Sequence, residues 1–168
     1  MTPFQYGYQQ QTMGPINSTS STNNKPDLAT IRTTLSGWTI LIVDDQPDNL
    51  MIAKVALEFQ GAKVSIAANG EEGLPLLTSI QPTVILLDLS MPKMDGWEML
   101  RRIRAQSETS RIPVIALTAH AMDGDRERVM DAGFDGYISK PFDVMTLPTE
   151  IQQALATHVL HNKDGAAS

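Results

Sequence analysis

The stretch TVILLDLSMP, residues 83–92, opens with a continuous run of apolar and β-branched residues that is followed by an aspartate at position 88. Such a run is typical of a strand buried on both faces of a parallel sheet. Similar runs occur at residues 39–43, 63–67, 113–117 and 136–139. We therefore predict five short buried strands, with the aspartate at the carboxyl end of the third.

Helical patterns follow each of these runs. Apolar residues at helical spacing predict helices around Leu50, Ala53 and Leu57; after Asn69; around Met99, Leu100 and Ile103; around Met122, Val129 and Met130; and along Leu147, Ile151, Ala154, Leu155 and His158. Asn69 can cap the second helix, whereas Pro75 predicts a kink or a late start in it. Strands that alternate with helices imply right-handed crossovers. We expect an α/β, flavodoxin-like, doubly wound parallel sheet of order 2-1-3-4-5 with five helices.

Composition limits the classes of function. The chain has 168 residues, a net charge of −6 and no cysteine. An acidic protein repels phosphate backbones, so no nucleic-acid partner is expected, and without cysteine there is no disulfide or thiolate metal site. No apolar run approaches the roughly 20 residues that span a bilayer, and no signal peptide is apparent. We expect no membrane association and a cytoplasmic location.

The amino-terminal part differs from the rest in composition. Residues 1–36 are rich in Gln, Ser, Thr and Asn, which bury too little apolar surface to offset the entropy of ordering. We predict a disordered polar tail there, one globular domain over residues 37–161 and a short carboxyl-terminal tail over residues 162–168. An alternative for residues 28–35 is a short docking segment.

Chemically active side chains follow the predicted strands. Asp44 and Asp45 come after the first strand, Asp88 after the third, Thr118 after the fourth and Lys140 after the fifth. In open α/β sheets ligands bind at the carboxyl ends of the strands, near the switch in strand order. Three carboxylates gathered there need a counter-charge, and Mg²⁺ prefers oxygen ligands and shares its positions with phosphate oxygens. An aspartate beside a phosphoryl donor can act as a nucleophile.

Each of these residues also has an ordinary interpretation. An aspartate after a strand is usually a turn residue or a helix cap. Thr118 could cap the next segment, and Lys140 could be an exposed loop charge. The fact that they all fall at the ends of strands of one predicted sheet favours a shared site.

At these positions the sequence resembles the receiver domain of two-component response regulators. The resemblance covers about residues 38–160 and rests on four segments in family order and spacing: LIVDDQP at 41–47, LLDLSMPKMDG at 86–96, IALTA at 115–119 and GYISKPF at 136–142. It implies a phosphoryl group accepted on Asp88. Because only residues 162–168 follow the last predicted helix, we expect a stand-alone, single-domain type of regulator, or one whose output is a protein contact.

The resemblance also implies a role for each neighbour. For the metal, it implies that Asp45 binds Mg²⁺ directly, that Asp44 acts mostly through a coordinated water, and that the backbone carbonyl of Ser90 completes the set with Asp88. For the phosphoryl group, it implies that Lys140 pairs with it and that Thr118 and Tyr137 form a switch pair. Ser90 and His120 resemble positions that tune the lifetime of the phosphoryl group, and the Lys140–Pro141 bond is expected to be cis.

The implied partners are a sensor histidine kinase or a histidine phosphotransfer protein, and a downstream protein that the sequence does not identify. The protein would catalyse only its own phosphorylation and dephosphorylation. An alternative is a Mg²⁺-dependent phosphatase with an aspartyl-phosphate intermediate; such enzymes usually carry a second aspartate two residues after the nucleophile, where this chain has Ser90. A third alternative is an interaction module that has lost its chemistry.

Overall fold

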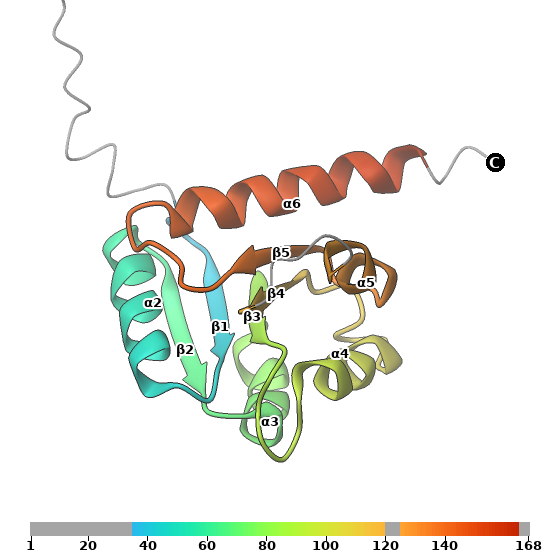
Figure 1. Ribbon diagram of the computed structural model, residues 1–168, viewed down its shortest axis with the longest axis horizontal. Helices are drawn as coiled ribbons and strands as arrows, with labels where there is room; N and C mark the ends of the chain where they lie inside the picture. Colours follow the sequence, from blue (N-terminus) through green and yellow to red (C-terminus); the bar gives the residue numbers. More distant parts are fainter. Residues whose placement is uncertain (1–34, 120–124, 165–168) are drawn as a thin grey trace, which may run out of the picture.

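A computed structural model describes residues 35–119 and 125–164, with side chains described to residue 156. In this part of the chain, strands and helices alternate along the sequence (Figure 1). The elements are β1 (Thr39–Val43), α2 (Pro47–Phe59), β2 (Lys63–Ala67), α3 (Gly70–Ile80), β3 (Val84–Asp88), α4 (Gly96–Ala105), β4 (Val114–Thr118), α5 (Asp125–Asp131), β5 (Gly136–Ser139) and α6 (Leu147–Asp164). The sheet is parallel with the order β2-β1-β3-β4-β5, so the predicted fold and strand order are confirmed.

The pairing register of the parallel strands brings their carboxyl ends, where the candidate site residues lie, to the same end of the sheet. Val43 is paired with Leu87, so the residues that follow β1 begin beside Asp88, the last residue of β3. Asp88 is in turn paired with Leu117, and Thr118 with Ser139. The carboxyl ends of four adjacent strands therefore meet, with the switch in strand order between β1 and β3.

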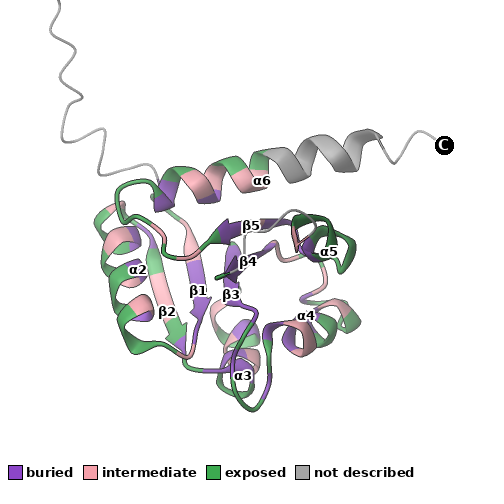
Figure 2. Cartoon of the chain, viewed as in Figure 1, coloured by how far each residue is buried: buried purple, intermediate pink, exposed green. Residues whose placement is uncertain are grey.

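Two apolar layers hold helices against the two faces of the sheet. Alternate residues of the central strands contact α2 and α6 on one face and α3, α4 and α5 on the other (Figure 1). The predicted apolar positions of α2 and α4, namely Leu50, Ala53, Leu57, Met99, Leu100 and Ile103, are all buried. Figure 2 shows the three central strands almost wholly buried between these layers.

Three predictions about local structure need correction or comment. The edge strand β2 is not buried on both faces, because one of its sides has no neighbouring strand and Lys63 and Ile66 are exposed. Helix α3 does not start late: it begins at Gly70, capped by Asn69 as predicted, and continues through Pro75. Met130 is partly exposed, so in the described part of α5 only Val129 faces the core.

Some predictions fall on residues that the structure does not describe. The segments 1–34, 120–124 and 165–168 lie outside the described residues, and with them most of the predicted amino-terminal tail, the end of the carboxyl-terminal tail, Met122 and His120. The side chain of His158 lies outside them as well. Leu35, the first described residue, is fully buried, and its N–H donates to the carbonyl of Gln60 over 3.1 Å.

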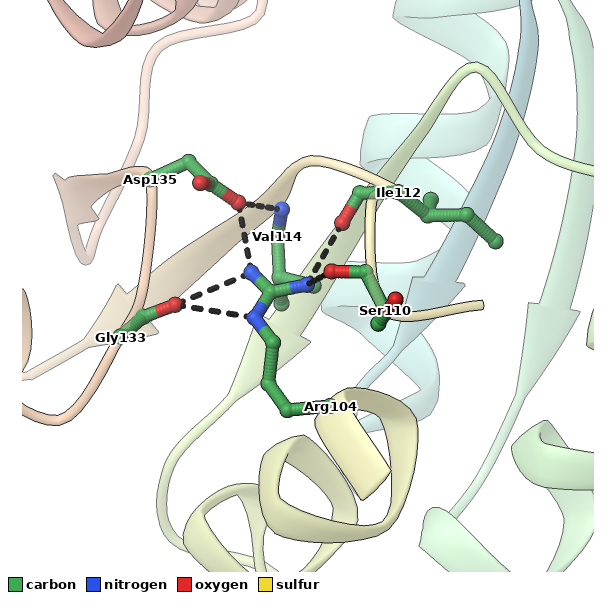
Figure 3. Close-up of polar contacts among 6 residues, drawn as sticks. All are labelled: Arg104, Ser110, Ile112, Val114, Gly133 and Asp135. Carbon is green, nitrogen blue, oxygen red and sulfur yellow. Dashed lines mark hydrogen bonds and ion pairs between the residues drawn. The ribbon is translucent and has the colours of Figure 1, made fainter. Parts of the chain in front are cut away.

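An arginine clamp ties α4 to the amino-terminal ends of β4 and β5 (Figure 3). The guanidinium of Arg104 donates to the carboxylate of Asp135 at 2.7 Å, and the same oxygen accepts the N–H of Val114 at 2.6 Å. Further guanidinium hydrogen bonds reach three backbone carbonyls, those of Ser110, Ile112 and Gly133. One planar, five-donor group thus fixes two loops, the one between α4 and β4 and the one between α5 and β5, at the end of the sheet opposite to Asp88.

Candidate functional site

Asp44 is held in place by the start of helix α2. It is fully buried, and one of its oxygens accepts the backbone N–H of Gln46 at 2.8 Å. The side-chain amide of Asn49, in the first turn of α2, donates to both carboxylate oxygens at 3.3 and 3.2 Å. The carboxylate therefore cannot rotate away from the sheet edge, whereas the adjacent Asp45 is only partly buried.

Asp88 is fixed by the loop that follows β3. Its side chain accepts the N–H of Ser90 at 3.1 Å, and it is nearly fully buried. Gly96, the first residue of α4, lies against the backbone of Asp88: a Cβ built on Gly96 would approach the carbonyl oxygen of Asp88 to 2.3 Å. Only glycine permits this close approach, so the start of α4 determines where the aspartate sits.

Lys140 joins the two buried aspartates. Its ammonium nitrogen lies 2.6 Å from an oxygen of Asp44 and 2.7 Å from an oxygen of Asp88. The backbone N–H of Lys140 donates to the carbonyl of Thr118 at 2.7 Å, which ties the end of β5 to β4. The peptide bond from Lys140 to Pro141 is cis, as expected.

Burial and hydrogen bonding shift the pKa values of Asp88 and Lys140 in opposite directions. Burial raises the pKa of the Asp88 carboxyl above its usual value, although the hydrogen bonds from Lys140 and from the Ser90 N–H oppose the shift. Burial alone would lower the pKa of Lys140, but its hydrogen bonds with Asp44 and Asp88 outweigh that effect and raise the pKa. The ammonium is therefore charged at neutral pH, and it partly compensates the carboxylates beside it.

The acidic trio could hold a metal ion. Asp44, Asp45 and Asp88 each offer a carboxylate oxygen, and these oxygens all lie within 4.8 Å of one another. Such oxygen-only donors suit a hard divalent cation such as Mg²⁺. The structure thus brings together three of the four predicted metal ligands, and Ser90 directly follows in the loop; the direct, water-mediated and carbonyl ligand roles stay predictions.

The predicted switch residues border the site on its other side. Thr118 is buried and lines a hollow of about 220 Å³ together with Ser90 and Trp97. Tyr137 is half-buried on β5, two residues before Ser139, the partner of Thr118 in the sheet. They belong to the neighbouring strands β4 and β5, and their role as a switch pair stays a prediction.

Two contributors to the site had no predicted role. Asn49 contacts both oxygens of Asp44, and the only sequence signal for it is an amide five residues after that aspartate, in the first turn of a predicted helix. Gly96 was part of a matched segment but had no assigned function. Its importance lies in a backbone approach to Asp88 that sequence spacing does not reveal.

The fold and the site define a class of protein, which comparison with known families identifies. A model described as the response regulator receiver domain matches residues 40–152. The chain is 37% identical over 105 residues to the polar-differentiation response regulator DivK of Brucella anthropi, covering 62% of this chain and 85% of DivK. The chain therefore belongs to the receiver domain family of two-component response regulators.

Other relatives and a solved structure agree with this assignment. An uncharacterized 14.6 kDa protein of Leptolyngbya boryana is 40% identical over 120 residues, which cover 71% of this chain and 92% of that protein. The structure of the chemotaxis response regulator CheY4 of Vibrio cholerae aligns with a TM-score of 0.66 at 30% identity, covering 70% of this chain and 98% of CheY4. By contrast, the chain spans 48% of the transcriptional regulator RpaA of Synechocystis sp., to which it is 38% identical over 116 residues.

Members of this family are signalling proteins rather than classical enzymes, which agrees with phosphorelay signalling. Among the described residues, no helix combines the length and the apolar character required to cross a membrane.

Proposed function

We propose that this protein accepts a phosphoryl group on Asp88 in a Mg²⁺-dependent reaction and thereby signals in a phosphorelay. The observation that carries the proposal is the position of the Lys140 ammonium, within 2.7 Å of both Asp44 and Asp88. This places a cation where negative charge develops on a transferring phosphoryl group, next to a carboxylate that can attack it. Membership of the receiver family and the acidic trio support it.

The reaction forms one bond and breaks one. An oxygen of the Asp88 carboxylate attacks the phosphorus atom, the bond between phosphorus and the donor's leaving group breaks, and an acyl phosphate results. Lys140 stabilises charge on the transferred oxygens, and the N–H of Ser90 orients the attacking carboxylate. Asp45, Asp44, Asp88 and the carbonyl of Ser90 would hold Mg²⁺, which when bound neutralises phosphate charge.

The donor would be a histidine kinase or a histidine phosphotransfer protein, and the output a protein contact. Phosphorylation favours one arrangement of Thr118 and Tyr137, and so one shape of the surface formed by α5, β5 and α6. A downstream protein that binds this shape better reads the signal. We assign this activity to a domain over residues 37–161, which contains the segment that matches the family, and we place the protein in the cytoplasm.

The experiment that tests the proposal compares the protein with its Asp88→Asn variant. With Mg²⁺ and acetyl phosphate, the wild type should gain one acid-stable, base-labile phosphoryl group, measured by intact-protein mass spectrometry, and the variant none. The variant should remain folded, because burial raises the pKa of this carboxyl. The ionised group therefore destabilises the folded state above that pKa, and the neutral amide removes this cost. Undiminished labelling of the variant would refute the site.

Metal dependence gives a second prediction, centred on Asp45. Asp45→Asn should weaken Mg²⁺ binding at least about tenfold, because the site loses one of three carboxylates, and chelation of Mg²⁺ should stop phosphorylation of the wild type. Isothermal titration with Mg²⁺ measures the first effect. Asp48→Asn is the matched control, since Asp48 lies one turn away in α2 outside the acidic trio. Equal loss of affinity in both variants would exclude Asp45 as a ligand.

A further inference from the structure

The ring of Tyr137 is covered by an arginine of the neighbouring helix. The guanidinium carbon of Arg126 lies 5.6 Å from the centroid of the Tyr137 ring, which is within the range of a cation–π contact. Arg126 is exposed and belongs to the first turn of α5, whereas Tyr137 is half-buried on β5. The contact thus joins an exposed side chain to a ring that packs partly against the core.

The same two residues border a hollow between α5, β5 and α6. This hollow has a volume of about 340 Å³, and Glu150 and Gln153 of α6 line its far side. Tyr137 therefore borders this hollow and also packs partly against the core. If the Tyr137 ring turned toward the buried Thr118, it would leave the hollow and lose its cation–π contact with the Arg126 guanidinium.

We infer that Arg126 is a positioning residue that holds the Tyr137 ring in its outward orientation and so sets the resting state of the switch. This inference rests on the proposed function, because it assigns a regulator to the switch pair of that same site. An interaction present in only one of two states shifts the equilibrium by its own free energy. An exposed cation–π contact corresponds to a shift of roughly two- to fivefold in population.

The chain offers a closely matched control. Arg128, two residues further along α5, also places its guanidinium over an aromatic ring, at 5.0 Å from the centroid of Trp97. Replacing Arg128 by glutamine removes one positive charge from the same helix, but it leaves the contact between Arg126 and Tyr137 in place. Arg126→Gln and Arg128→Gln therefore remove the cation from different rings; because Arg128 also lines the hollow beside Thr118, the two variants are compared by the ligand-free readout.

The test uses the full chain labelled with fluorotyrosine, with the Tyr137 resonance assigned through Tyr137→Phe. The solvent isotope effect on that fluorine resonance reports how exposed the ring is. In Arg126→Gln the isotope effect should fall without any ligand, whereas Arg128→Gln should match the wild type. Arg126→Lys should restore most of the wild-type value, because it keeps the cation.

A second readout uses beryllofluoride with Mg²⁺ as the phosphoryl analogue. Arg126→Gln should reach half-saturation at roughly two- to fivefold lower beryllofluoride, since the competent state is more populated. An unchanged isotope effect in Arg126→Gln, or an equal fall in Arg128→Gln, would overturn the inference. Failure of the wild type to bind beryllofluoride would instead refute the proposed function, and the ligand-free isotope effect would still decide the role of Arg126.

Discussion

Replacement of Arg104 by methionine is expected to lower the free energy of unfolding by about 3 to 5 kcal/mol. Methionine keeps much of the apolar stem but removes all five donors. The carboxylate of Asp135, whose side chain is only 11% exposed, then loses its ion pair with the Arg104 guanidinium. The carbonyls of Ser110, Ile112 and Gly133 lose their donor as well. Urea denaturation followed by circular dichroism measures the change.

Two controls separate the clamp from a general effect of losing an arginine. Arg102 pairs with Glu98 on the same helix but is more than half exposed, so Arg102→Met should cost less than about 1 kcal/mol. The double variant Arg104→Met with Asp135→Asn should regain part of the lost stability, because the buried charge is removed together with its partner. Equal losses in Arg102→Met and Arg104→Met would contradict the role assigned to the clamp.

A methyl group at Gly96 is expected to cost about 3 kcal/mol and to impair phosphorylation. The added Cβ would lie 2.3 Å from the carbonyl oxygen of Asp88 and 2.9 Å from the Cα of Leu89. Both are backbone atoms, so the strand end that carries the acceptor, or the start of α4, must shift. We expect a lower unfolding midpoint in urea and, at a temperature where the variant is folded, slower labelling by acetyl phosphate.

Gly70 provides the control for this substitution. It is the first residue of α3, directly after the capping Asn69, just as Gly96 follows the capping Asp95. A Cβ at Gly70 would meet only side-chain atoms of the buried Met94, which must shift, and no backbone atom. Gly70→Ala should therefore lower the free energy of unfolding by less than Gly96→Ala does and leave labelling normal. If the two variants behaved alike, close backbone approach would not explain the glycine at position 96.

Much of this architecture could be predicted because local pattern and global topology agree. Continuous apolar runs that end in Asp88 or Thr118 predict the strands. They also predict the end of the sheet where the site residues gather, since parallel strands align their carboxyl ends. The convergence of Asp44, Asp88 and Lys140 followed from that rule alone. Their ligand and switch roles came from family resemblance, and the geometry agrees with these roles without testing them.

What the sequence did not reveal depends on contacts between distant residues. Arg104 and Asp135 are 31 positions apart, and neither belongs to a pattern that distinguishes a buried pair from two surface charges. The exposure of β2 could not be read from its apolar run, because only the strand order makes it an edge. The position of Gly96 against Asp88 likewise requires the path of the loop between β3 and α4.

The hydrogen bonds that immobilise Asp44 have a consequence for ion selectivity. With the Gln46 N–H, Asn49 and Lys140 all directed at this carboxylate, few of its lone pairs remain to coordinate a cation. An ion in the acidic trio must therefore retain much of its own hydration shell. Calcium fills about six to eight coordination positions from a flexible cage of oxygens, whereas magnesium gives up its water reluctantly. We therefore expect an ion bound at this site to be magnesium rather than calcium, because too few protein oxygens remain to fill the coordination positions of calcium.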